Sequence, residues 1–319
     1  MNPIPADWAL STTHIASEYV SRQFSVLIGV GPKVLPPIEL DVVLLMACSK
    51  LARTLAEAYR NPEVLQTMET GLKSGREELL LARFPPDRQI ILERPAVVLD
   101  KFGIIVLWYL PGAIDAAIQN DMMAVTVMMS GPLGTTWFLQ GHPAPKFHPE
   151  ISATLRVMQR PAALIAAALR IMHPRLYWSS LTIQLGLGLW AANNQLQDMA
   201  DLLRVWGSVF TVLAVLCNRR SPLHHDALSC AQWFDAMLSV SGYGPARMRM
   251  PNIGIEIAYN SGVMAAASGR IVWHGVDNVN GDRISWVWYM RDDVHQFVDV
   301  PRAEYSKYMS IIDDSLSCT

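Results

Sequence analysis

The spacing of apolar side chains in the first part of the chain is typical of an amphipathic helix. Between residues 39 and 60, apolar residues recur every three or four positions, at Leu44, Ala47, Leu51, Leu55 and Ala58. Charged residues lie between them, so a helix over this stretch would have one apolar and one polar face. Because Pro62 interrupts the pattern, we predict that the helix ends near Arg60.

Short aliphatic runs then replace the helical spacing. The runs 89–92 and 96–99 precede a turn at 100–103 and a further run at 104–109. Runs of this length bounded by turn residues predict strands that pair with one another. Pro111 and Gly112 end the stretch, and the residues after them, 113–129, predict a helix.

The second half of the chain changes from helical to β character. Glycine and proline are too frequent between residues 130 and 149 for a regular element, so we predict an irregular connection there. Helices are expected at 153–172, with a break at Pro161, and at 195–206. From Val209 onward, β-branched and aromatic residues with recurring turn signals predict a mainly β portion. The pattern as a whole indicates an α+β protein.

Composition narrows the class of protein. The 319 residues are 51% hydrophobic and 17% charged, below the roughly 25% charged residues of a typical soluble domain, which excludes a disordered chain. Apolar runs are interrupted well before the roughly 20 residues that a membrane-spanning helix needs. The start of the chain does not resemble a secretory signal, so we expect an intracellular protein with no membrane partner.

Charge and cysteine content exclude further classes. The net charge of −2 does not indicate a nucleic-acid binder, so any such partner would need a local basic surface. The four cysteines form no CxxC pair, which argues against a zinc knuckle or a disulfide framework. We expect reduced thiols that lie mostly in the core.

Two local patterns are weaker candidates for chemistry. Gly186, Gly188 and Ala191 match a dinucleotide-binding fingerprint, but no strand, turn and helix unit surrounds them, so tight packing is the favoured interpretation. His142 and His148 lie near each other in the proline-rich connection, where metal binding is one hypothesis and solvated loop histidines are the favoured one.

The strongest pattern has the form HxD…H…RxS, made by His224, Asp226, His274, Arg283 and Ser285. Two neutral imidazoles and one carboxylate can bind iron(II) on one face and leave three positions, enough for a bidentate 2-oxoglutarate and dioxygen. The far carboxylate of 2-oxoglutarate then needs a fixed cation, and the fork of an arginine matches a carboxylate. A hydroxyl two residues along the same strand, Ser285, can add a hydrogen bond.

A register argument places these residues together. If 271–276 and 283–290 form a hairpin with Val276 opposite Arg283, then His274 lies opposite Ser285 on one face. The other face then carries Ile284, Trp286, Trp288 and Met290. An inward-pointing Arg283 would need a carboxylate partner, because burying an unpaired charge is costly.

Several stretches resemble a known family. They are residues 218–226 (NRRSPLHHD), 233–235 (WFD), 269–276 (GRIVWHGV), 281–285 (GDRIS) and 289–292 (YMRD), with 97–111 (VVLDKFGIIVLWYLP) upstream. Together they resemble the fungal branch of the TET/JBP-type Fe(II)/2-oxoglutarate dioxygenases. The middle residue of the HxD is His225 in this chain, where arginine is more frequent.

The resemblance implies a fold and a site. The expected fold is a double-stranded β-helix (jelly-roll) core flanked by N-terminal and middle helices. A mainly helical region over residues 1–94 would precede a dioxygenase domain over 95–319, with the iron site within 209–292. Iron(II) would bind His224, Asp226 and His274, while Arg283, Ser285 and Asn218 would contact the cosubstrate 2-oxoglutarate.

The resemblance also implies a substrate, namely the methyl group of 5-methylcytosine or of N6-methyladenine in DNA, oxidised while 2-oxoglutarate is decarboxylated to succinate. The base would have to be flipped out of the duplex, and the protein would act in the nucleus. Arg219 and Arg220 would contact phosphates, with Arg247 and Arg249 as further candidates, and Asp235 is a polar candidate for substrate binding. Two alternatives stay open, the same chemistry on a small apolar metabolite and a catalytically silent jelly-roll binding module.

Overall fold

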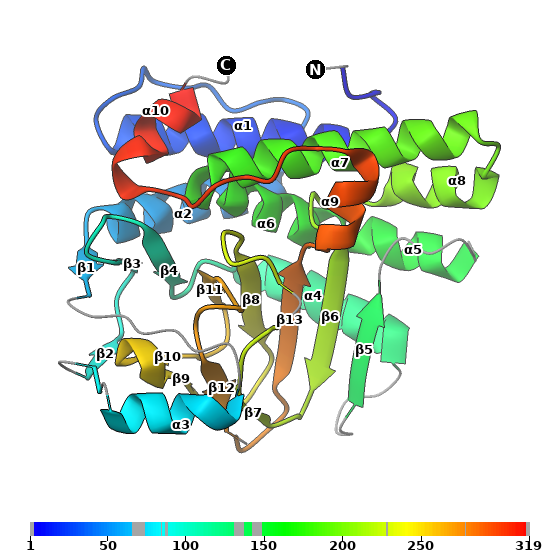
Figure 1. Cartoon of the computed structure of the whole chain (residues 1–319). Helices are drawn as coiled ribbons and strands as arrows, with labels where there is room; N and C mark the ends of the chain where they lie inside the picture. The colour runs from blue at the N-terminus through cyan, green and yellow to red at the C-terminus, as the bar shows by residue number, and fades with distance from the viewer. Residues whose placement is uncertain are drawn as a thin grey trace.

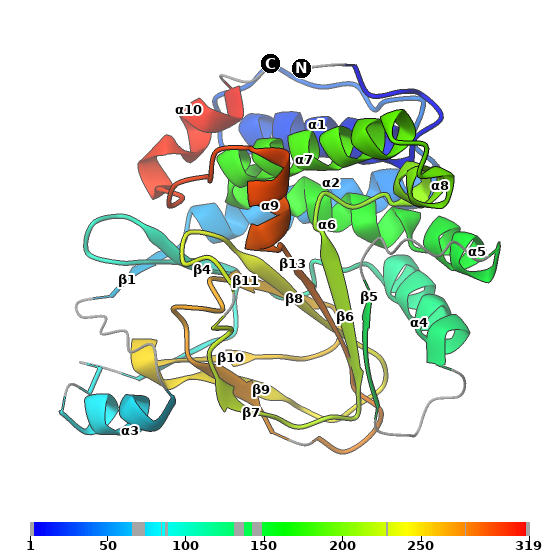
Figure 2. The same cartoon turned by 45° about the vertical axis from the view of Figure 1, so that its right-hand side comes forward.

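The computed structural model divides into a helical layer and a two-sheet β portion (Figures 1 and 2). It describes residues 3–65, 74–83, 85–86, 89–130, 137–141, 149–227, 229–277 and 279–316. In both views most of the helices lie above the strands, and the two chain ends lie on the outer side of the helical layer. None of the helices in these ranges is long and apolar enough to cross a membrane.

The helices of the described residues are α1 (Ala9–Leu27), α2 (Val42–Tyr59), α3 (Ser74–Arg83), α4 (Ala116–Ser130), α5 (Pro149–Val157), α6 (Gln159–Met172), α7 (Pro174–Asn193), α8 (Gln197–Val205), α9 (Asp292–Val298) and α10 (Ile311–Leu316). Helix α1 packs against α2 and α6, and α2 also contacts β3 and β4. The helical layer therefore covers one face of the larger sheet.

The strands are β1 (Pro62–Val64), β2 (Ile90–Leu92), β3 (Ala96–Leu99), β4 (Ile105–Leu110), β5 (Trp137–Gly141), β6 (Val212–Cys217), β7 (Ser221–His224), β8 (Asp235–Val240), β9 (Arg247–Met250), β10 (Ile255–Ala258), β11 (Val263–Ala267), β12 (His274–Val276) and β13 (Ile284–Tyr289). Within the described residues they form an eight-stranded sheet, in the order β1-β3-β4-β11-β8-β13-β6-β5, and a five-stranded sheet, in the order β2-β10-β9-β12-β7.

Alternate residues of the larger sheet enter two different cores. On β13, the side chains of Ile284, Trp286 and Trp288 pack in the core shared with the helices. On β3 and β11, the side chains of Val98 and Ala265 pack with residues of the smaller sheet, such as Ile257. This alternation follows from the two-residue period of a strand, and it leaves one face of the larger sheet to form the interior of the β portion.

The predicted helix after residue 39 is confirmed as α2. Asp41 precedes it and caps it, because its carboxylate accepts hydrogen bonds from the backbone N–H groups of Val43 and Leu44, both at 3.0 Å. The predicted strand pairing is confirmed for β3 and β4, which are antiparallel neighbours. The first aliphatic run, β2, pairs instead with β10 of the other sheet.

The helical middle of the chain differs from the prediction in two ways. The expected break at Pro161 is wrong, because α5 ends at Val157 and Pro161 lies in the first turn of α6, where a missing N–H costs nothing. Helix α7 was not predicted, although it contains Gly186 and Gly188. A Cβ on Gly188 would lie 2.3 Å from the ring of Trp8, so this glycine allows close packing, as expected.

The first 94 residues contribute to both sheets as well as to the helical layer. Strand β1 pairs in parallel with β3, and β2 pairs in parallel with β10. The predicted division of the chain at residues 94 and 95 stays a prediction.

Replacing the helix cap tests the assignment of α2. We expect Asp41→Ala to lower the free energy of unfolding by about 1 kcal/mol, because two backbone N–H groups lose their acceptor. Urea denaturation measures the change. The exposed Asp7, which pairs with Arg204 at 3.6 Å, provides the control, and Asp7→Ala should change stability by less than about 0.5 kcal/mol. Equal effects of the two substitutions would contradict the capping role.

Candidate active site

A cavity of about 440 Å³ lies between the two sheets. Its walls come from both sheets and from the loop after β7, and they include His224, Asp226, Ala227, Ser229, Asp235, Met237, Tyr259, His274, Arg283, Ser285, Val287, Tyr289 and Arg291. All three residues of the predicted iron triad and both residues of the RxS pair therefore face one shared space. A volume of this size is typical of sites for small ligands.

The triad forms a compact cluster. The ligand atoms of His224, Asp226 and His274 all lie within 4.8 Å of one another. The Nε2 atoms of His224 and His274 lie 3.7 and 3.8 Å from separate carboxylate oxygens of Asp226. The cluster combines side chains from β7, from the turn after β7 and from β12, and it could hold a metal ion.

Backbone carbonyl groups fix the orientation of both imidazole rings. His224 donates a hydrogen bond from Nδ1 to the carbonyl of Pro222 at 2.7 Å, and His274 donates from Nδ1 to the carbonyl of Val272 at 2.9 Å. Because a carbonyl can only accept, the proton of each neutral ring lies on Nδ1. The lone pair of each Nε2 is then available to a metal, which is the usual arrangement of metal-binding histidines.

His274 lies in an environment that favours its neutral form. Burial lowers its pKa, the neighbouring His224 lowers the pKa further, and the carboxylate of Asp226 opposes these effects. Only the neutral ring binds a metal. Because the surroundings of His274 favour this form, a proton competes less with a metal ion for its ring nitrogen.

Asp235 lies close to Asp226, at the start of β8. Burial and the charge of Asp226 raise the pKa of Asp235 well above its usual value, which favours the protonated acid. The hydroxyl of Ser229 donates to Asp235 at 3.2 Å. A Cβ on Gly269 would lie 2.3 Å from Asp226 and 2.4 Å from Asp235, so both carboxyl groups lie directly over the Cα of this glycine.

Arg283 is a buried cation whose contacts within the described residues are all uncharged. Its guanidinium donates to the hydroxyl of Ser285 at 3.2 Å and to the backbone carbonyl of Arg219 at 2.6 Å. In the part of the chain that the structure describes, no Asp or Glu forms an ion pair with it. A buried guanidinium without an anionic partner is costly, and a carboxylate ligand in the cavity would compensate it.

The other predicted polar residues lie near Arg283, and Asn218 contacts its backbone directly. Asn218, with a positive φ of 51°, accepts a hydrogen bond from the backbone N–H of Arg283 at 2.8 Å and donates to Asp282 at 2.6 Å. Arg220 pairs with Asp277 at 3.5 Å. Neither Asn218, Arg219 nor Arg220 lines the large cavity, whereas Asp235 does.

The predicted hairpin between β12 and β13 is wrong. His274 lies opposite His224 of β7, and Ser285 lies opposite Leu216 and Ser239. Strands β12 and β13 belong to different sheets, so the polar residues between them cross from one sheet to the other. His274 and Ser285 therefore approach each other across the interior, and the face with Ile284, Trp286, Trp288 and Met290 packs against the helices, as predicted.

The cavity is also lined by residues that were not predicted from the sequence. On β13 and just after it, Val287, Tyr289 and Arg291 continue the alternation that begins with Arg283 and Ser285. The two-residue period of a strand could have indicated them. Tyr259, from the other sheet, lies 3.4 Å from the Ser285 hydroxyl. Trp206, Trp233, Trp273, Trp286 and Trp288 are buried and belong to the core, while His142 and His148 lie outside the described residues.

Comparison with known proteins identifies the domain. Residues 145–292 match the Tet_JBP family, described as the oxygenase domain of the 2OGFeDO superfamily. These residues thus form an oxygenase domain of the Fe(II)- and 2-oxoglutarate-dependent dioxygenase superfamily, as predicted from the sequence. Nothing in the match separates a fungal branch of the family, so that branch stays a prediction.

One solved structure shares the fold, and another is more distantly similar. NgTET1 in complex with 5mC DNA has a TM-score of 0.50 and 14% identity, with 84% of this chain and 96% of that chain covered. The viral collagen prolyl hydroxylase vCPH from Paramecium Bursaria Chlorella virus-1, in its 2OG complex, has a TM-score of 0.33 and 10% identity, with 57% and 94% covered. No curated protein matches the chain. The likeness to NgTET1 confirms the predicted α+β fold with a jelly-roll core.

Gly269 offers a test of the carboxylate arrangement. We expect Gly269→Ala to weaken binding of Ni²⁺, a redox-inert probe, by at least about tenfold, because the added methyl group would displace Asp226. Isothermal titration calorimetry measures the affinity. Gly242→Ala is the matched control, since a Cβ at Gly242 meets nothing within 4 Å. Unchanged Ni²⁺ affinity in the Gly269 variant would exclude the close contact.

Proposed function

We propose that this dioxygenase oxidises the methyl group of a DNA base, with 5-methylcytosine as the first candidate and N6-methyladenine as the second. The observation that carries the proposal is the convergence of the triad, the buried Arg283 and the buried Asp235 on one cavity, in a chain whose residues 145–292 match the Tet_JBP oxygenase domain. A complex of NgTET1, which shares the fold, contains 5mC DNA. Action on DNA would place the protein in the nucleus.

His224, Asp226 and His274 would hold iron(II), and Arg283 with Ser285 would hold the far carboxylate of 2-oxoglutarate. The donor set fits iron(II), because two neutral imidazoles and one carboxylate come from one side of the cavity. Arg283 fits the cosubstrate, because the guanidinium is fixed by Arg219 and Ser285 and lacks a carboxylate partner among the described residues. Asn218 contributes by holding the backbone of Arg283.

Iron(II) and 2-oxoglutarate would supply oxidation of a substrate C–H bond by dioxygen, in which one oxygen atom enters the substrate and the other enters succinate as the keto acid loses CO2. The protein's own residues bind the substrate and the cosubstrate, orient them and exclude water from the cavity. Val287 and Met237 form an apolar part of the cavity wall, between Arg283 at one end of β13 and Tyr289 at the other. A methyl group can approach the triad along this wall without displacing a polar contact.

Asp235 would recognise the flipped base. A protonated carboxyl group can donate a hydrogen bond to an acceptor atom on the base edge and also accept one. Its neighbour Ser229 lines the same cavity and fixes the second oxygen of Asp235. Asp235 would thus offer the base edge a polar group in a fixed position in the cavity wall.

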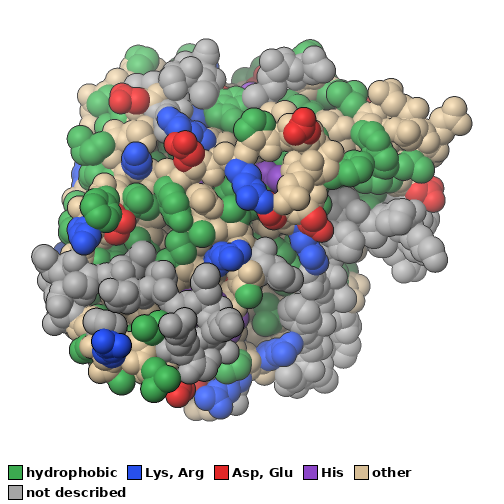
Figure 3. All heavy atoms as spheres, viewed as in Figure 1, with side chains coloured by type: hydrophobic (Ala, Val, Ile, Leu, Met, Phe, Trp, Pro, Cys, Tyr) green, Lys and Arg blue, Asp and Glu red, His purple; other side chains and the backbone are tan. Residues whose placement is uncertain are grey.

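Contact with the DNA backbone would depend on a local group of arginines. Lys and Arg side chains form separate patches on the face shown in Figure 3, without one continuous basic surface. Arg220 and Arg249 both pair with Asp277, at 3.5 and 2.8 Å, so a phosphate would compete with this carboxylate for them. Arg219 is exposed beside them and is the third candidate.

The substrate is tested directly by product analysis. We expect methylated oligonucleotides, incubated with Fe(II), 2-oxoglutarate and air, to yield an oxidised methyl group and an equal amount of succinate by mass spectrometry. His274→Ala should abolish both products, because one of two imidazole ligands is lost. An oxidised base without this dependence on His274 would refute the assignment of the site.

The second candidate substrate is a small apolar metabolite, favoured by the near-neutral net charge of the chain and by the pairing of the arginines with Asp277. A metabolite panel in the same assay distinguishes the two. Binding of duplex DNA that weakens steeply with salt supports the DNA substrate, whereas turnover of a metabolite with no oxidised base supports the second candidate.

Arg283 carries a separate prediction. We expect Arg283→Met to raise the KM for 2-oxoglutarate by at least about tenfold, because a charge-assisted bidentate contact is lost. Steady-state succinate formation measures it. The control is Arg247→Met, since Arg247 pairs with Glu93 and Glu256 at the surface. An unchanged KM in the Arg283 variant would mean that another cation holds the cosubstrate.

A further inference from the structure

We infer that Asn252 and Arg270 are positioning residues, which hold His274 and Asp226 in place by fixing the backbone on either side of one turn. The turn is formed by residues 268–273 and leads directly into β12 and His274. The inference rests on the proposed role of His274 and Asp226 as metal ligands, and it adds two residues outside the cavity lining.

Asn252 holds the carbonyl group that orients His274. Its side chain is buried, donates from Nδ2 to the carbonyl of Ile271 at 2.9 Å, and accepts from the backbone N–H of Trp273 at 2.9 Å. These two contacts lie on either side of Val272, whose carbonyl accepts the Nδ1 proton of His274. One amide side chain thus fixes the peptide groups around the acceptor that determines the tautomer of His274.

Asn252 reaches this position from a different part of the fold. It lies in a short 3-10 helix, Pro251–Ile253, between β9 and β10. An amide donates from its nitrogen and accepts at its oxygen, so two separate atoms can contact the two ends of such a turn at once. A carboxylate of the same shape can accept from Trp273 but opposes the carbonyl oxygen of Ile271.

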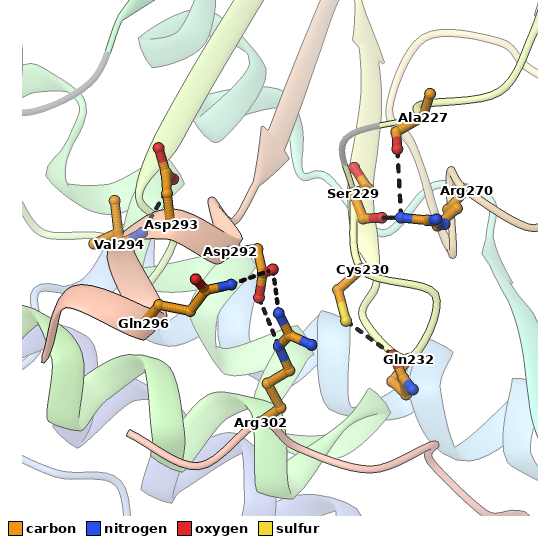
Figure 4. Close-up of polar contacts among 10 residues, drawn as sticks. All are labelled: Ala227, Ser229, Cys230, Gln232, Arg270, Asp292, Asp293, Val294, Gln296 and Arg302. Atoms are coloured by element: carbon orange, nitrogen blue, oxygen red, sulfur yellow. Dashed lines mark hydrogen bonds and ion pairs between the residues drawn. The ribbon is translucent and has the colours of Figure 1, made fainter. Parts of the chain in front are cut away.

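Arg270 acts on the other side of the turn. Its Nη1 donates to the carbonyls of Ala227 and Ser229, at 3.4 and 3.3 Å, as Figure 4 shows. These carbonyls belong to the loop that follows Asp226. The backbone N–H of Asp226 in turn donates to the carbonyl of Gly269, at 2.9 Å. The loop with the carboxylate ligand is therefore held at two points by consecutive residues of the turn, Gly269 and Arg270.

The arrangement explains why two ligands from different strands keep one geometry. Asp226 is attached to the turn by hydrogen bonds, and His274 follows the turn in the chain. The 2.9 Å contacts of Asn252 keep the turn itself from shifting. Loss of Asn252 would let the Val272 carbonyl rotate away, whereas loss of Arg270 would release the loop that carries Asp226.

The test uses Ni²⁺ alone as the probe, in isothermal titration calorimetry of the full chain. We expect Asn252→Asp to weaken Ni²⁺ binding by about 10 to 100-fold, the usual effect of removing a hydrogen-bond partner behind a metal ligand. Asn61→Asp is the matched control, because Asn61 also donates to a backbone carbonyl, of Pro95 at 3.0 Å, far from the triad. Its Ni²⁺ affinity should stay within about twofold of the wild type.

Arg270→Met separates positioning from electrostatics. Removing a positive charge near a bound dication should strengthen metal binding if charge alone matters. Positioning predicts the opposite, a weaker affinity, and Arg22→Met, at an exposed arginine that pairs with Glu18, should leave the affinity unchanged. Tighter Ni²⁺ binding in the Arg270 variant would overturn its assigned role.

Two further measurements keep the result interpretable. Thermal unfolding and near-ultraviolet circular dichroism establish that each variant is folded at the titration temperature. If Asn252→Asp is unfolded, Asn252→Ser replaces it. Its hydroxyl is a smaller donor and acceptor, so its Ni²⁺ affinity should lie below that of the wild type but retain part of it. If the wild type binds no Ni²⁺, or if His274→Ala binds as well as the wild type, the proposed metal site fails. If the wild type binds through His274 and the folded Asn252→Asp variant binds equally well, only the positioning role fails.

Discussion

The site depends on two hydrogen bonds from imidazole rings to backbone carbonyls. His224 donates to Pro222 and His274 donates to Val272, each to a carbonyl two residues earlier in the chain. These local contacts direct both Nε2 atoms toward Asp226. The rest of the β portion holds the two carbonyls at the correct separation, since β7 and β12 are paired with His274 opposite His224. Ligand geometry is therefore a property of the backbone as much as of the side chains.

Burial has opposite consequences for the cationic and acidic groups of the cavity. It favours the neutral forms of His274 and Asp235 through their pKa values. Arg283 cannot respond in this way, because a guanidinium keeps its proton at any physiological pH. Arg283 thus stays charged beside two groups whose neutral forms burial favours, which suits its end of the cavity to an anionic ligand.

Local patterns in the sequence predicted the parts of the fold that depend on local physics. The capped helix α2, the pairing of β3 with β4 and the apolar face of Trp286 and Trp288 each follow from spacing alone. The pairing of β12 could not be predicted, because its partner β7 is distant in sequence and the choice between sheets depends on the whole barrel. The residues of the HxD…H…RxS pattern line one cavity as expected, but they face each other from two different sheets rather than from one hairpin. The role of Asn252 could not be predicted from the sequence, since a lone asparagine before a strand is typical of any turn.

Strand β13 joins both ends of the cavity within a single rigid segment. Arg283 precedes it, Arg291 follows it, and alternate residues between them face the cavity. Its opposite face is occupied by tryptophans packed under the helices. One inserted or deleted residue would exchange the two faces, burying Ser285 among the indole rings and turning a tryptophan toward the cluster of His224, Asp226 and His274. The length of this strand is consequently less tolerant of change than any single side chain on it, and natural variation here should be confined to substitutions.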